Sequence, residues 1–96
     1  MAKAKIVIHS KVNDPDGMIT EFTVWKLPAP SQERPHGLKY SFFFGREGIR
    51  IIAYDNERGK GDHRHYLDRE EKYVFVSIEK LMSDFLKDIQ DYRRRR

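Results

Sequence analysis

The stretch LKYSFFFGREGIRIIA, residues 38–53, decides the fold of this 96-residue chain. Every second residue in each half is apolar: Leu38, Tyr40, Phe42 and Phe44 in the first, and Ile49, Ile51 and Ala53 in the second. A period of two is typical of a strand with one buried face. The four residues between the halves, Gly45 to Gly48, supply a turn. The stretch therefore predicts a β-hairpin.

The residues before this hairpin predict another one. Lys3 to Val12 alternates apolar and polar side chains, and the sequence NDPDG at 13–17 is strong turn chemistry. Met18 to Leu27 suits a second strand with apolar residues on both faces. Pro28 to Gly37 contains three prolines and cannot continue a sheet ladder, so it predicts a loop.

The C-terminal third predicts a helix that covers the sheet. Ser77 is a candidate N-cap. Apolar residues then recur at the spacing of an amphipathic helix: Ile78, Leu81, Met82, Phe85, Leu86, Ile89 and Tyr92. Tyr73 to Val76 would form a short fifth strand. We expect an α+β fold, an antiparallel sheet of four to five strands with one C-terminal helix packed across one face. It forms a single domain, 1–96, with a frayed or disordered basic tail at 93–96.

Composition excludes several classes of protein. The chain has no cysteine, which excludes disulfides, thiolate metal ligands and thiol nucleophiles. No segment approaches the ~20 apolar residues of a membrane span, and the N-terminus lacks a signal-peptide core. We therefore expect a cytoplasmic protein. Arg93 to Arg96 account for the net charge of +4, so the remainder is neutral and has no broad basic face.

The polar stretch YDNERGKGDHRH, residues 54–65, is the candidate site. If its last residues are extended, His63 and His65 point to the same side and Arg64 to the other. Cleavage of RNA by its own 2'-hydroxyl needs a base, an acid and positive charge near phosphorus. His63 and His65 would transfer the protons, Arg58 and Lys60 would supply the charge, and no metal would be needed.

The remaining residues of the stretch receive supporting roles. Tyr54 would orient a nucleotide beside the catalytic groups. Contacts to RNA would come from Asn56, Gly59, Gly61 and Arg64, because glycines let a ligand approach the backbone closely. Asp55 and Asp62 would be structural or orienting.

Two alternatives use the same residues. The first is a non-catalytic module that binds RNA or a protein through the cations of the glycine-flanked loop. The second is a metal site, in which His63 and His65 join Asp55 or Asp62 as ligands of a divalent ion. Neighbouring cations oppose that ion unless they lie on other faces, so our leading expectation is a site without metal or cofactor.

The stretch also carries a family resemblance. Together with Asp68-Arg69-Glu70 and the run YVFVSIEKLMSDFLKDI at 73–89, it resembles the TumE-like toxin components of bacterial and archaeal toxin–antitoxin modules. Positions that match the family's motif are Asp55, Asn56, Arg58, Gly59, Lys60, Gly61, Asp62, His63, Arg64 and His65. The resemblance implies a cytoplasmic toxin with a helix-turn-helix antitoxin, an RNA target and no membrane association. The protein is either a monomer or a homodimer.

The other two histidines are expected to lie outside the site. His9 falls in the first predicted strand and His36 in the proline-containing loop. Nothing in the sequence places either one near the polar stretch, so we expect them to be ordinary strand and loop histidines.

Overall fold

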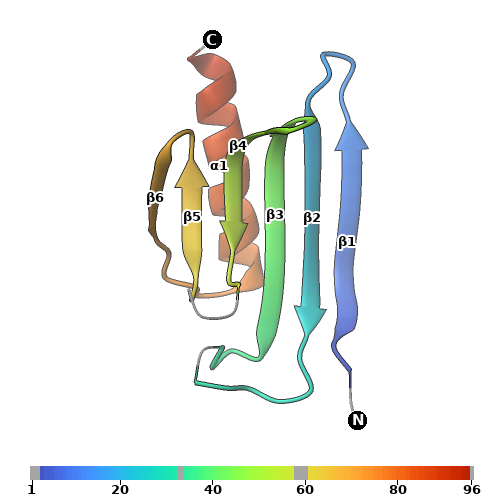
Figure 1. Ribbon diagram of the computed structural model, residues 1–96, viewed down its shortest axis with the longest axis vertical. Coiled ribbons are helices and arrows are strands. Elements are labelled where there is room, and N and C mark those ends of the chain that lie inside the picture. The colour runs from blue at the N-terminus through green and yellow to red at the C-terminus, as the bar shows by residue number, and fades with distance from the viewer. Residues whose placement is uncertain (1–2, 33, 58–60, 96) are drawn as a thin grey trace.

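The computed structural model describes residues 3–32, 34–57 and 61–95 and shows one antiparallel sheet with one helix (Figure 1). The sheet has six strands in chain order, so each strand pairs with the next. These elements are β1 (Lys5–Asn13), β2 (Ile19–Lys26), β3 (Leu38–Arg46), β4 (Ile49–Asp55), β5 (His63–Tyr66), β6 (Arg69–Lys72) and α1 (Ile78–Arg94). The predicted α+β class, the two predicted hairpins and the C-terminal helix are confirmed.

The core forms where α1 covers the middle of the sheet. Tyr40, Phe42 and Phe44 on β3 are almost fully buried, as the alternation predicts. The ring of Phe85 on α1 lies edge-on to Phe42, with 5.2 Å between ring centroids. In Figure 1, α1 lies behind the β4 and β5 side of the sheet, whereas β1 and β2 extend beyond it. The half of the sheet that the helix covers therefore includes the polar stretch.

The prediction of four to five strands was wrong, and so was the position of the fifth. Tyr73–Val76 forms no strand, whereas the polar residues of β5 and β6 add two strands beyond β4. A tight turn joins β5 to β6, and Leu67 there has a φ of 57°. The segment Tyr73–Val76 instead leads from β6 to α1. Its aromatic side chains pack against the core, and its valines are exposed.

Both edge strands of the sheet carry charge. β6 consists of four exposed charged residues, REEK at 69–72. β1 carries Lys5 and Lys11, and its pairing with β2 is irregular between Ile6 and Ile8. These strands are first and last in the sheet order.

The helix begins at the predicted N-cap, Ser77. The Ser77 side chain caps it by accepting a hydrogen bond from the backbone N–H of Lys80. Of the predicted apolar stripe, Leu86 is 45% exposed and lies outside the core. α1 continues to Arg94, and Arg93 forms ion pairs with Asp14 and Asp16 of the first hairpin. Among the described residues, no helix has the length and apolar character needed to cross a bilayer.

A row of carboxylates on α1 fastens the helix to the strands. The hydroxyls of Tyr73, Tyr54 and Tyr66 donate hydrogen bonds to Asp84, Asp88 and Asp91, respectively. Asp88 also accepts from Nε and a terminal nitrogen of Arg64, at 2.8 and 2.9 Å. Burial and the Asp88 acceptor raise the pKa of Tyr54, so its hydroxyl remains a donor. Asp88 thus joins α1 to both β4 and β5.

Replacement of Asp88 by alanine should destabilise the protein. It leaves the Tyr54 hydroxyl and two of the three guanidinium nitrogens of Arg64 without their acceptor in a mostly buried site, although the third nitrogen keeps its contact with Glu71. We expect a loss of about 2 kcal/mol in the free energy of unfolding, less than for a fully buried pair because solvent screens part of the charge. Urea denaturation measures it. Glu47→Ala, in an exposed turn, should change stability by less than ~0.5 kcal/mol; equal effects of the two substitutions would refute the role of Asp88.

Candidate functional site

The pairing of β4 with β5 brings the histidines opposite Asp55. His63 pairs with Asp55, Arg64 with Tyr54 and His65 with Ala53. Neighbouring side chains of a strand point to opposite faces. Because Arg64 bonds to Asp88 on α1, the two histidines face away from the helix. The prediction that His63 and His65 share a side, opposite Arg64, is confirmed.

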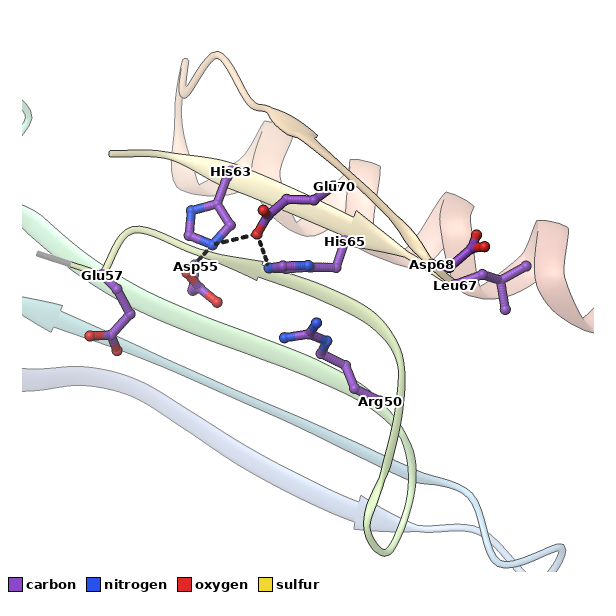
Figure 2. Close-up of a pocket in the computed structure, with 8 residues that line it drawn as sticks. All are labelled: Arg50, Asp55, Glu57, His63, His65, Leu67, Asp68 and Glu70. Carbon is purple, nitrogen blue, oxygen red and sulfur yellow. Dashed lines mark ion pairs between the residues drawn. The ribbon is translucent and has the colours of Figure 1, made fainter. Parts of the chain in front are cut away.

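These histidines line a pocket of about 480 Å³ on the face of the sheet away from α1 (Figure 2). Its described lining consists of Arg50, Asp55, Glu57, His63, His65, Leu67, Asp68 and Glu70. The lining therefore combines two imidazoles and four carboxylates with a single guanidinium. The expected cations Arg58 and Lys60 lie outside the described residues, so this balance describes only the rest of the lining.

The two imidazoles point toward the same space. Nε2 of His63 lies 2.7 Å from Oδ1 of Asp55 and 3.8 Å from Oε2 of Glu70. Nε2 of His65 lies 3.0 Å from the same Glu70 oxygen. Figure 2 shows both rings directed between the two carboxylates. The side chains of both histidines are more than nine-tenths buried.

A hydrogen bond from the other ring nitrogen of His63 shows which nitrogen carries the hydrogen. Nδ1 lies 3.0 Å from the backbone carbonyl oxygen of Gly61. A carbonyl oxygen only accepts, so Nδ1 carries the hydrogen. In the neutral ring, Nε2 then presents its lone pair toward Asp55. Among the described residues, Oδ1 of Asp55 is buried and has no hydrogen-bond partner, although Nε2 of His63 is close to it.

His65 lies beside this pair in a different electrostatic environment. Its ring lies edge-on to that of His63, with centroids 4.9 Å apart. Burial lowers the pKa of His65, and the charge of Arg50 lowers it further. The neutral ring, with a lone pair on one nitrogen, is thus favoured for His65.

Several pocket residues did not emerge from the sequence. Glu70 reaches the site because β5 and β6 form a hairpin in which it pairs with His65. Arg50 reaches it because the pairing of β3 with β4 shifts register between Phe44 and Gly45, which interrupts the alternation of faces. Glu57 follows β4, and Asp68 lies in the turn between β5 and β6. An HRHYLDRE pattern read as a hairpin would have indicated Glu70, whereas no sequence signal marks the shift in register.

Two of the predicted site residues, Tyr54 and Asn56, lie outside the pocket. Tyr54 is 1% exposed and lies with Arg64 on the helix side of the sheet. Asn56 is also fully buried: its side chain accepts from the backbone N–H of Tyr40 and donates to the carbonyl of Leu38. Neither side chain is exposed to an RNA ligand. The predicted catalytic and RNA-binding residues Arg58, Gly59 and Lys60 lie outside the described residues.

Asp62 brings an unexpected histidine close to the polar stretch. Gly61 precedes it with a φ of 72°, a backbone conformation that favours glycine. Oδ2 of Asp62 accepts from the hydroxyl of Tyr40 at 2.8 Å and lies 3.2 Å from Nε2 of His36. The expectation that His36 lies away from the stretch was wrong, because the loop before β3 folds back against it. His9 bonds to Thr23 on β2, as an ordinary strand histidine.

Comparison with known proteins identifies the class to which this fold and pocket belong. A family model described as Toxin TumE matches residues 2–93. The chain therefore belongs to a family of toxins, the TumE family, as the resemblance indicated. Membership of a toxin family implies an antitoxin partner. Searches of curated proteins and of solved structures found no match.

Replacement of Asn56 by alanine tests its structural role. The substitution leaves two backbone groups of β3 without partners, and each buried unpaired group costs about 1 to 3 kcal/mol. We expect a loss of about 3 kcal/mol in the free energy of unfolding, measured by urea denaturation. The matched control is Asn13→Ala, at the exposed end of β1, which should cost less than ~0.5 kcal/mol. A stable Asn56→Ala protein with impaired RNA binding would instead support a role in binding.

Proposed function

We propose that this toxin cleaves RNA and that the reaction takes place in the histidine pocket. The observation that carries the proposal is the convergence of two buried imidazoles on one space, lined also by carboxylates. Groups that transfer protons near neutral pH are rarely placed together without a chemical use, and buried ones mark candidate active sites.

The reaction that fits these groups is attack by the RNA's own 2'-hydroxyl. Its oxygen forms a bond to phosphorus as the bond from phosphorus to the 5'-oxygen breaks, leaving a 2',3'-cyclic phosphate and a 5'-hydroxyl. One group of the pocket takes the proton of the 2'-hydroxyl, and another gives a proton to the departing 5'-oxygen. The sequence gives these two roles to His63 and His65 jointly; we infer that His65 is the base and His63 the acid. This assignment agrees with the lowered pKa of His65.

The charge of the pocket sets a further requirement. A phosphate that enters meets four carboxylates and only one guanidinium, that of Arg50, among the described lining residues. Like charges repel strongly where water is partly excluded. Additional positive charge must therefore reach the phosphate, either from Arg58 and Lys60 or from a bound cation.

The proposal extends to the partner and the cellular compartment. A toxin that attacks RNA acts in the cytoplasm and needs an antitoxin there. We propose a helix-turn-helix protein as the antitoxin. Adjacent genes for the toxin and such a protein, and neutralisation on co-expression, test this part of the proposal.

Substitution of both histidines tests the site of cleavage. In His63→Gln/His65→Gln, the loss of both imidazoles should reduce RNA cleavage by at least about 100-fold, measured on total RNA with purified protein, and should abolish growth inhibition. His9→Gln is the matched control, because His9 also lies on a strand and outside the pocket. Circular dichroism establishes that each variant is folded.

Three results distinguish the alternatives. Full cleavage and toxicity in the double variant would place the reaction elsewhere. Stable complexes of the unsubstituted protein with intact RNA would favour a binding module over an enzyme. Toxicity without any effect on RNA would refute the RNA target.

A further inference from the structure

We propose that Asp55, His63 and His65 bind a divalent transition-metal ion, with Zn²⁺ as the best-matched ion. The ligand atoms are Oδ1 of Asp55 and Nε2 of each histidine. This inference deepens the proposed function: the ion's binding site stands on geometry alone, whereas its part in catalysis rests on RNA cleavage in this pocket.

The geometry of the three side chains supports the site. One ligand atom from each residue lies within 4.8 Å of the other two. Ligands of a tetrahedral Zn²⁺ at about 2.1 Å are about 3.4 Å apart. Small rotations of three side chains therefore bring them to binding distance. The three ligands lie on rigid elements: both histidines are on β5, and Asp55 is on the neighbouring strand β4, opposite His63.

The contact between His63 and Asp55 favours a positive charge between the two atoms. The Gly61 carbonyl fixes the hydrogen on Nδ1 of His63, so in the neutral ring the Nε2 lone pair lies 2.7 Å from a carboxylate oxygen. That oxygen is buried and makes no hydrogen bond within the described part of the chain. Two acceptors in contact repel each other unless a positive charge lies between them. A metal ion supplies this charge, as would a proton on Nε2.

The surroundings resemble those of metal-binding histidines. A histidine that binds a metal through one ring nitrogen commonly donates a hydrogen bond from the N–H of the other to a backbone carbonyl, which orients the ring. The carbonyl of Gly61 accepts such a bond from His63. Oε2 of Glu70 lies beside these ligand atoms, 3.0 Å from Nε2 of His65. Of the neighbouring cations that would oppose a metal ion, Arg64 lies on the other side of the sheet with Asp88, whereas Arg58 and Lys60 lie outside the described residues. Arg50 remains as the one described cation in the lining.

The ligand set selects the kind of ion. Two imidazoles and a carboxylate suit Zn²⁺ and similar transition metals, whereas Mg²⁺ prefers oxygen ligands alone. Three protein ligands leave a coordination position open for a phosphate oxygen. The ion would then supply the positive charge that RNA cleavage requires in this pocket. Both Nε2 lone pairs would be occupied, so the carboxylates of Glu70 and Glu57 would replace the imidazoles in proton transfer.

Titration calorimetry of untagged protein with ZnCl₂, after treatment with a chelator and its removal, tests the site. We expect one ion per chain, bound with a micromolar or lower dissociation constant, and no detectable Mg²⁺ binding under the same conditions. Asp55→Asn and His65→Gln should each weaken Zn²⁺ binding at least tenfold. His36→Gln is the matched control, since His36 also lies beside a buried aspartate, Asp62, and it should leave affinity unchanged.

A second measurement needs no substitution. Nuclear magnetic resonance of the histidine ring nitrogens in ¹⁵N-labelled protein should show Zn²⁺ shifting Nε2 of His63 and His65 while leaving His9 and His36 unaffected. Absence of binding, equal affinity in Asp55→Asn, or shifts confined to His9 and His36 would overturn the site. Absence of binding would also assign the contact with Asp55 to a protonated His63.

RNA cleavage with and without the ion separates the two proposals. If both hold, chelation abolishes cleavage and Zn²⁺ restores it. Zn²⁺ bound at the three residues with RNA left intact would refute the function and keep the site. Cleavage at full rate after chelation, by a protein that binds no Zn²⁺, would refute the site and keep the function.

Discussion

The contact of Arg64 with Asp88 is the constraint on which the pocket depends. Arg64 lies between the two histidines in a strand only four residues long. Because its guanidinium is held by a carboxylate of the helix, both neighbouring side chains must face away from α1. A shift of β5 by one residue would send the histidines into the core and the arginine into the pocket. The same ion pair that fastens the helix thus fixes the register of the site.

Much of the fold followed from apolar periodicity. The hairpin at 38–53 and the helix of Leu81, Phe85 and Ile89 have strong alternation or helical spacing, and both lie where expected. β5 and β6 did not follow, because HRHY and REEK contain almost no apolar residues. β5 forms through pairing with β4 and polar contacts to the helix, and β6 forms through pairing with β5. Strand propensity and hydrophobic periodicity do not predict such contacts between residues distant in the sequence.

The site was predictable only as far as local geometry reaches. The shared side of His63 and His65 follows from their spacing in an extended chain. The participation of Glu70 and Arg50 depends on a hairpin and on a shift in register, and neither can be derived from residue spacing within 54–65. We predicted from the sequence that Asn56 contacts RNA. In the structure it is buried and completes the backbone hydrogen bonds of β3. A polar residue in a glycine-rich segment can either contact a bound ligand or form hydrogen bonds with the protein's own backbone.

The charged outer strands have a consequence for the behaviour of the molecule in concentrated solution. An open sheet invites other chains to add strands at its margins, which leads to aggregation. Here one margin is short and bears a charge at every position, and the other is bent and carries lysines that would oppose each other if two copies paired antiparallel about Ile8. The charges thereby oppose edge-to-edge pairing between copies of this chain. Acidic side chains on a partner strand would instead complement the lysines of β1.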